Sequence, residues 1–191
     1  TSDKSPNQAN GVLKNINEAL AFLPDLVIIS NPSPYHLNYA IPFSEKGINL
    51  FIEKPLSSNL DNIKIFLNKV KTNKTFVSLG YNLRFVSSLI EFKKQLIESG
   101  IGKIYFFNSV AGQYLPDWRP KLDYTKNVSA NKNLGGGVLL ELSHEIDYAR
   151  WLFGEVEYTN GQIFTNSNLD INVEDTAYIL LKFKRNLQNH K

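Results

Sequence analysis

A glutamate, a histidine and an aspartate stand at three-residue steps directly after three consecutive glycines. The glycines are residues 135–137, and the three side chains are Glu141, His144 and Asp147. Apolar residues recur at three- and four-residue steps as far as Leu152, so the sequence predicts one amphipathic helix. Such a helix places a carboxylate beside an imidazole, and the glycines let a ligand or another backbone come close. The pair could transfer protons.

The Glu–His spacing also allows interpretations that involve a metal or no chemistry. A Glu-x-x-His helix occurs in di-iron bundles, but these need a second copy and two further carboxylates, which the sequence lacks. His144-Glu145 begins like the zinc-protease motif, but Tyr148 stands where the second histidine is required. No metal site is therefore expected. The remaining alternative is a helix histidine bonded to a backbone group.

A lysine follows the second of three expected strands. Lys54 lies between Glu53 and Pro55, directly after the apolar run 48–52. A partly desolvated lysine at a strand end can exchange a proton with a substrate hydroxyl, although most strand-end lysines are simply solvated. Pro55 holds the turn in one shape and can adopt the cis form.

Trp118 and Arg119 form a further candidate site in an irregular segment, residues 113–134. A flat aromatic next to a planar cation suits a polar ring, a carboxylate or a phosphate. The alternative is a loop held to the core by its aromatic residues. Glu174 and Asp175 are interpreted as solvated residues at the start of a strand.

Alternating strand and helix patterns surround Lys54 in the first part of the chain. The apolar run 25–30 is bounded by prolines, which is typical of a strand buried on both faces of a parallel sheet. The alternation predicts half of a doubly wound α/β fold, whose ligands bind at the carboxyl ends of the strands. The expected strands are 25–30, 48–52 and 76–80, and the expected helices are 16–23, capped by Asn15 or Asn17, 35–46, ended by Gly47, and 59–72.

After Arg84 the pattern changes to helices and strands in series. This order predicts an α+β domain with a mainly antiparallel sheet. We therefore expect a partial Rossmann-like parallel sheet, residues 1–84, followed by part of an α+β domain, residues 85–191. The expected elements of the second part are helices at 87–99 and 138–152 and strands at 104–112, 156–165 and 174–184.

The composition excludes several classes of function. The 191 residues carry a formal net charge of +3 from dispersed lysines and arginines, which indicates neither a nucleic-acid nor a membrane partner. No cysteine is present, so disulfides and thiolate zinc sites are excluded. The polar N-terminus does not resemble a secretory signal, and a cytoplasmic protein is expected. Methionine is absent even at position 1, and both ends look incomplete for the two predicted domains.

Taken together, these segments resemble the Gfo/Idh/MocA family of NAD(P)-dependent sugar and polyol dehydrogenases. They follow the family's order over nearly the whole chain. The Gln113–Ala130 segment and the run 143–147 resemble a subgroup often found in nucleotide-sugar and sialic-acid-like pathways. The matching segments are residues 24–32 with His36, residues 53–55, residues 80–85, residues 135–147 and residues 173–177.

The resemblance implies a role for each candidate residue. Lys54 would relay a proton and His144 would be the second acid/base group, while a hydride passes between a secondary alcohol and NAD or NADP. Glu141 would help to hold a sugar, polyol or nucleotide-sugar substrate. Residues 1–84 would be the C-terminal part of a dinucleotide-binding domain, and residues 85–191 the first part of a substrate and oligomerisation domain. The nicotinamide end would be lined by Ser30, Asn31, Pro32, His36, Glu53 and Asn82, and Trp118, Arg119 and Tyr124 would face nicotinamide or substrate.

The sequence departs from the family pattern at three places. The residue after the glycines is Glu141 rather than aspartate, and His144 follows it by three residues rather than four. The first strand with its glycine-rich turn and most of the second sheet are not found. We therefore expect the chain as given to bind cofactor poorly, and the alternative is a catalytically inactive fragment that binds or scaffolds. A homo-oligomer is expected at full length.

Overall fold

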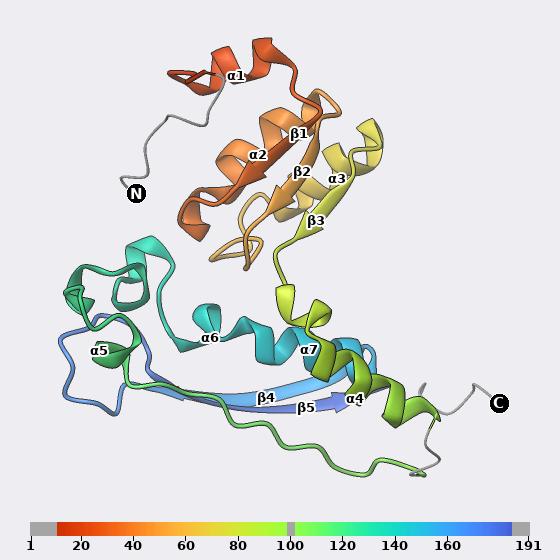
Figure 1. The fold of residues 1–191 in the computed structure, drawn as a ribbon, viewed down its shortest axis with the longest axis vertical. Helices are drawn as coiled ribbons and strands as arrows, with labels where there is room; N and C mark the ends of the chain where they lie inside the picture. Colours follow the sequence, from red (N-terminus) through yellow and green to blue (C-terminus); the bar gives the residue numbers. More distant parts are fainter. Residues whose placement is uncertain (1–10, 99–101, 185–191) are drawn as a thin grey trace. The chain divides into compact units, whose positions relative to one another are not determined.

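The computed structural model describes residues 11–98 and 102–184 (Figure 1). The chain separates into two units, one formed by residues up to Asn31 with Tyr35–Leu79, the other by Pro32–Pro34 with the residues from Gly80 onward. The first unit holds a sheet in the order β1-β2-β3, and the second holds a sheet of β4 and β5. This arrangement confirms the predicted fold class.

The first unit alternates strands and helices as the sequence predicts. All three strands run parallel, and Ile52 of β2 pairs with Ile29 of β1 on one side and Leu79 of β3 on the other. Asn15 is the cap of the first helix, since its side chain accepts from the Glu18 amide at 3.0 Å. The elements are α1 (Ile16–Phe22), β1 (Leu26–Ile29), the 3-10 helix η2 (Ser33–Tyr35), α2 (His36–Glu45), β2 (Asn49–Ile52), α3 (Ile63–Asn73) and β3 (Val77–Leu79).

The core of the first unit lies on one face of β1, so the expectation that β1 is buried on both faces is wrong. Ile29 is buried and Val27 packs against the core, whereas Leu26 and Ile28 are 52% and 66% exposed. Residues of α1, α2 and α3 all pack on the core cluster. Exposed and buried side chains alternate along β1 because successive side chains of a strand point to opposite faces of the sheet.

The third helix begins at Ile63, later than the predicted start at residue 59. The side chain of Asn59 accepts from the Asp61 amide at 2.9 Å, and Asn62 adopts a left-handed conformation with φ of 61°. Asparagine side chains compete in this way with helical hydrogen bonds, so residues 59–62 form a turn.

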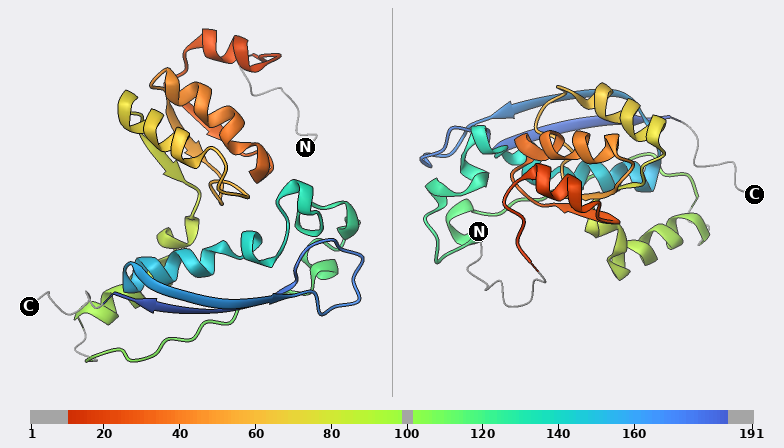
Figure 2. Two further views of the ribbon diagram at one scale, coloured as in Figure 1. Left: turned by 180° about the vertical axis from the view of Figure 1, so that it is seen from behind. Right: turned by 90° about the horizontal axis from the view of Figure 1, so that it is seen from above.

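The second unit consists of short helices and one antiparallel pair of strands. Its two strands are antiparallel as predicted, with Gly161 opposite Ile179. Figure 2 shows α6 and α7 lying along this pair. The predicted end of the helix at residue 99 lies outside the described residues. The elements are η3 (Asn82–Phe85), α4 (Ser87–Glu98), α5 (Leu115–Trp118), η4 (Tyr124–Lys126), η5 (Val128–Ala130), η6 (Lys132–Leu134), α6 (Val138–Glu141), α7 (Ser143–Phe153), β4 (Val156–Phe164) and β5 (Thr176–Phe183).

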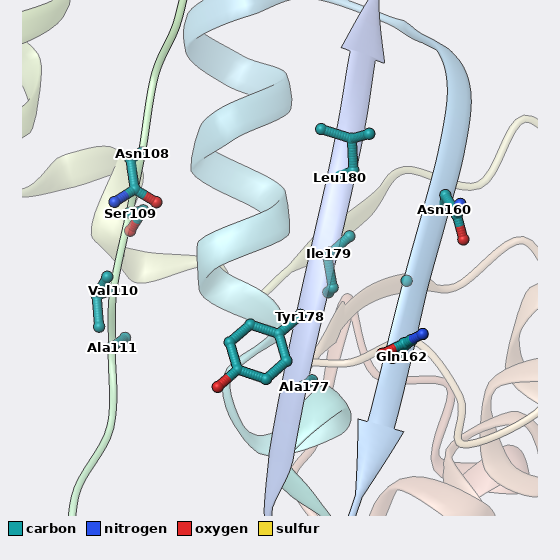
Figure 3. A pocket seen from close by; sticks show the side chains of 11 residues that line it. Asn108, Ser109, Val110, Ala111, Asn160, Gln162, Ala177, Tyr178, Ile179 and Leu180 are labelled. Carbon is teal, nitrogen blue, oxygen red and sulfur yellow. The ribbon is translucent and has the colours of Figure 1, made fainter.

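The prediction of a strand at 104–112 is wrong for the part of the chain that the structure describes. Residues 108–111 lie beside β5 but are separated from it by a groove of about 620 Å³ (Figure 3). A strand requires ladder hydrogen bonds with a neighbour, and the sheet of this unit contains only β4 and β5 among the described residues. Ser109 instead donates its hydroxyl to Glu145 at 2.8 Å, which ties the extended segment to α7.

The predicted helix 138–152 is two helices, broken at Leu142. This residue has φ of −98° and ψ of 25°, and the Glu145 amide bonds to its carbonyl three residues back. Such a bond belongs to the tighter 3-10 geometry and interrupts the α-helical ladder. Glu141 and His144 therefore do not share one helix, so helical spacing does not make them neighbours.

The buried ring of Phe66 provides a test of the first core. Phe66 is 1% exposed, whereas Phe76 in the same unit is 67% exposed. We expect Phe66→Ala to lower the free energy of unfolding by about 3 to 5 kcal/mol, because it leaves a cavity. The matched Phe76→Ala should cost about 1 kcal/mol or less. Urea denaturation followed by circular dichroism measures both. Equal losses would contradict this description of the core.

Candidate functional site

The ends of β1 and β2 lie side by side in the first unit. The Glu53 amide donates to the Ile29 carbonyl at 2.8 Å, which extends the pairing one residue past the end of β2. Glu53 and Lys54 are half-buried, and the Lys54 amide donates to the Glu53 carboxylate at 3.1 Å. The Lys54–Pro55 peptide is cis, as the sequence allowed. Polar groups from two strand ends are therefore held together at one edge of the sheet.

His36 joins these two strand ends from inside the protein. Its ring is 1% exposed, with Nδ1 2.9 Å from the Pro55 carbonyl and Nε2 2.7 Å from the Asn31 carbonyl. Both ring nitrogens are thus occupied by backbone oxygens. The predicted role of His36 in lining the cofactor would therefore run through the backbones of Asn31 and Pro55.

The side chain of Asn31 leaves a buried oxygen unsatisfied at the end of β1. Within the described part of the chain, Asn31 Oδ1 is buried and has no hydrogen-bond partner. Buried polar atoms are normally paired, and ligands of doubly wound folds bind at this end of the strands. A ligand that carries an N–H donor, such as a nicotinamide cofactor, fits this position. Ser30 beside it is exposed.

Each of the three glycines is closely approached by other atoms of the protein. A Cβ on Gly136 would overlap the Val128 carbonyl and lie 2.7 Å from the Ser129 carbonyl. Gly137 has φ of 105°, and its Cβ would overlap the carboxylate of Glu174. Gly136 therefore meets another backbone, and Gly137 meets a side chain of the protein.

Glu174 caps the start of α6, which corrects its interpretation as a solvated residue. Its carboxylate accepts from the Leu139 amide at 3.2 Å, and its carbonyl accepts from the Val138 amide at 3.0 Å. The first amides of a helix lack partners within the helix and favour negative charge. Glu174 therefore fixes the helix that carries Glu141, a half-buried candidate for substrate binding.

Asp175 also binds backbone amides. Its carboxylate accepts from the Asn166 and Ser167 amides, each at 2.9 Å, and from the Thr176 hydroxyl at 2.8 Å. Burial raises the pKa of Asp175, but these hydrogen bonds outweigh it and hold the pKa well below its usual range. The interpretation of Asp175 as a solvated strand start is therefore also wrong.

His144 lies on the first turn of α7 against Tyr81. The two rings are edge to face, with centroids 5.5 Å apart and an interplanar angle of 85°. One turn along, Asp147 receives two hydrogen bonds from Arg84, at 2.8 Å from Nε and 2.6 Å from the terminal nitrogen. The hydrogen bond to Asp147 raises the pKa of Arg84, although burial acts in the opposite direction.

Sequence reasoning gave Tyr81 and Arg84 no functional role. The one signal in the sequence was that Tyr81 and Arg84 are separated by three residues, as are His144 and Asp147. This match has a meaning only once the contacts between the two pairs are known.

The other predicted residues of the second unit lie on its surface or in its loops. Trp118 ends α5 and is 38% exposed, and Arg119 after it is exposed. The Tyr124 hydroxyl accepts from the Asp170 amide at 3.2 Å, so it closes a loop of its own unit. Asn82 is exposed at the start of η3.

Two negative findings hold for the described residues. No group of three or more histidine or acidic side chains among them could hold a metal ion. In the same ranges, every helix is too short or too polar to span a membrane.

The parallel sheet with helical crossovers defines the class as a doubly wound α/β unit joined to an α+β unit. A family model described as "Oxidoreductase family, NAD-binding Rossmann fold" matches residues 6–81. A second model, "GFO/IDH/MocA C-terminal domain", matches residues 91–189. The chain therefore belongs to the Gfo/Idh/MocA family of oxidoreductases.

Named relatives and a solved structure agree with this assignment. The chain is 27% identical over 168 residues to myo-inositol 2-dehydrogenase of Thermotoga maritima, covering 84% of this chain and 46% of that protein. It is 30% identical over 146 residues to levoglucosan dehydrogenase of Pseudarthrobacter phenanthrenivorans, covering 74% and 37%. The crystal structure of myo-inositol 2-dehydrogenase from Lactobacillus plantarum shares the fold, with a TM-score of 0.75, 22% identity and coverage of 90% and 51%. The chain spans less than half of the length of the two curated relatives.

The close approach at Gly136 provides a test of the second unit. We expect Gly136→Ala to destabilise this unit by roughly 1 to 3 kcal/mol, because a methyl group would push two backbone carbonyls apart. Gly112→Ala is the matched control, since a Cβ there meets nothing within 4 Å. It should change stability by no more than about 0.5 kcal/mol. Thermal unfolding of both variants measures the difference. A Gly136→Ala protein as stable as the parent would contradict the close approach.

The depressed pKa of Asp175 predicts acid sensitivity. A carboxyl group with a lower pKa in the folded state stabilises the fold above its unfolded pKa of about 4 and loses this effect as pH falls toward the folded value. We expect Asp175→Asn to reduce the free energy of unfolding at pH 7, and the deficit to shrink steadily below about pH 4. Urea titrations from pH 7 to pH 3 measure this. Asp117→Asn, an exposed carboxylate of the same unit, is the control. A deficit independent of pH would refute the charge-based explanation.

Proposed function

We propose that the protein transfers a hydride between a secondary alcohol of a sugar, polyol or nucleotide sugar and NAD or NADP. Membership of the family gives the general class of oxidoreductase, and the names of the relatives indicate cyclic polyols and sugars as the substrate class. The observation that carries the proposal is the strand-end cluster, where Glu53, Lys54 and Pro55 are fixed beside Asn31 by the buried ring of His36.

Lys54 is proposed to accept the hydroxyl proton of the substrate. Its backbone is restrained on both sides, by the Glu53 contacts before it and by the His36–Pro55 contact after it. A general base must be held in position to be effective, and a lysine on a fixed backbone can bring its neutral amino group to the substrate hydroxyl and take up the proton as an ammonium group. The bound nicotinamide would supply the hydride chemistry itself.

His144 is proposed as the second acid/base group, and Glu141 as a substrate ligand. His144 is half-buried and packed edge to face on Tyr81, and Glu141 lies on the helix that Glu174 caps. Imidazole changes its protonation near neutral pH, which suits it to move a proton in both reaction directions. Trp118, Arg119 and Tyr124 are proposed as further contacts to substrate.

The residues at the end of β1 are proposed to hold the nicotinamide end of the cofactor. Asn31 would accept a hydrogen bond through its unsatisfied Oδ1, and Ser30 is exposed next to it. Pro32, Glu53 and Asn82 complete the proposed set, with His36 acting through the backbone. Homo-oligomeric assembly at full length and a cytoplasmic location are part of the same proposal.

Replacement of Lys54 tests the mechanism. We expect Lys54→Met to lower kcat by roughly 10²- to 10⁴-fold, because the general base is lost. NADH and NADPH affinity, followed by nicotinamide fluorescence, should stay unchanged. Lys46→Met is the matched control, since Lys46 is an exposed lysine of the same unit. Steady-state assays with myo-inositol, levoglucosan and a UDP-sugar measure turnover.

Two outcomes would count against the proposal. Near-parental turnover in Lys54→Met would remove the role given to Lys54. A parent that binds the sugars but shows no turnover with either cofactor would favour the alternative of a non-catalytic binding protein.

A further inference from the structure

We propose that Arg84 is a positioning residue for His144, acting through Asp147 and Tyr81. The inference rests on the proposed acid/base role of His144. The observation behind it is a pair of contacts that both join η3 to α7. Tyr81 and Arg84 are three residues apart, at the cap and within η3, and His144 and Asp147 are three residues apart on α7.

The two contacts fix the register of η3 on α7. Tyr81 packs edge to face on His144 at 5.5 Å between centroids, and Arg84 binds both carboxylate oxygens of Asp147 at 2.6 and 2.8 Å. Residues three apart on a helix share a face, so His144 and Asp147 point to the same neighbour. A ring contact alone allows sliding and rotation. A bidentate guanidinium–carboxylate pair does not, because two parallel hydrogen bonds define both direction and plane.

The turn that carries Arg84 transmits this restraint to Tyr81. The Arg84 amide donates to the Tyr81 carbonyl at 3.3 Å, so the two residues belong to one hydrogen-bonded turn. The Asp147 side chain is only 10% exposed, compared with 39% for Arg84. The carboxylate is therefore the buried anchor, and Arg84 reaches it from the edge of the contact.

A cationic neighbour gives the carboxylate a further role. Lys93 of α4 lies over the Trp151 ring of α7, 4.1 Å from its centroid. Burial and then the charge of Arg84 lower the pKa of Lys93, so the two cations lie within electrostatic reach of each other. Asp147 offsets this repulsion and keeps Arg84 against α7. Without the pair, η3 would keep its ring contact but lose the bond that orients it.

Nuclear magnetic resonance of the histidine rings tests the inference without any need for turnover. The chain has three histidines, so ¹³Cε1 labelling gives three signals, and His144→Gln assigns one of them. Tyr81 shifts the His144 signal through its ring current, and Tyr81→Leu gives the unshifted reference. We expect Arg84→Gln to move the His144 signal most of the way to that reference, and Arg84→Lys to move it part of the way.

Arg150→Gln is the matched control for this experiment. Arg150 lies on the same helix and binds both carboxylate oxygens of Glu155 at 2.8 Å, but the pair is exposed. The control should leave the His144 signal in place. The signal of buried His36 reports only whether the first unit is folded, so circular dichroism and thermal unfolding of each variant report whether the second unit, which carries the substitutions, is folded. An Arg84→Gln protein with an unmoved His144 signal, or an Arg150→Gln protein with an equal shift, would overturn the inference.

Turnover separates this inference from the proposed function. We expect Arg84→Gln to lower kcat by about tenfold to hundredfold with little change in cofactor KM, since misplacement of a catalytic group has effects of this size. Arg84→Lys should recover part of the loss. If His144→Gln keeps full turnover while the Arg84→Gln shift is seen, the catalytic role of His144 fails and the positioning stands. If His144→Gln loses turnover and Arg84→Gln keeps it, the positioning fails and the proposed function stands.

Discussion

A buried backbone polar group must find a hydrogen-bond partner, and this constraint shapes both halves of the candidate site. In the first unit, the two ring nitrogens of His36 lie within hydrogen-bond distance of the carbonyls of Asn31 and Pro55. In the second unit, the amides at the start of α6 are met by Glu174. In each case a side chain distant in sequence satisfies the end of a strand or helix, and the candidate functional groups lie beside that end. The candidate functional groups are thus held in place by side chains that are not themselves proposed to react.

The charged pairs on α7 show why position decides what an ion pair does. Arg150–Glu155 is exposed, and such pairs contribute about 0 to 1 kcal/mol because water and salt screen them. Arg84 donates to Asp147 from two different nitrogens, one for each carboxylate oxygen, whereas Arg150 uses one nitrogen for both oxygens of Glu155. The Asp147 carboxylate is also only 10% exposed. Breaking a buried pair costs more, since it leaves an uncompensated charge. The partial exposure of Arg84 reduces that cost, so the pair matters more for the geometry of the contact than for overall stability.

The pair of strands in the second unit depends on α7 for its stability. A two-stranded ribbon is only marginally stable by itself. Phe153 at the end of α7 packs between Phe107 and Phe183, with centroid distances of 4.8 and 5.6 Å. The same helix therefore carries His144 at its start and holds the sheet at its end. On the β5 strand, Tyr178 and Leu180 stay 67% and 61% exposed beside the groove, an apolar surface of the kind found where proteins make further contacts.

The sequence by itself determined what depends on neighbours along the chain. Burial periodicity indicated the parallel alternation and the antiparallel pair, and local capping chemistry indicated Asn15 or Asn17 at the start of α1 and Gly47, with φ of 72°, after α2. The ordered segments indicated the family. Predictions from local patterns failed where a group a few residues away formed a hydrogen bond that competes with the α-helical ones, as at the turn before α3 and at the break at Leu142.

Only the tertiary structure decided which distant groups meet. His36 binds Pro55 across 19 residues, Glu174 caps Leu139 across 35, and Arg84 binds Asp147 across 63. Residues 104–112 have a strand-like pattern, but they do not join the sheet of β4 and β5, and a pattern along the chain cannot show whether a ladder partner is in place. Periodicity reports which face of a segment is buried. The hydrogen-bond partner of a group depends on the folded path of the whole chain, and that path decided which residues hold Lys54 and His144 in place.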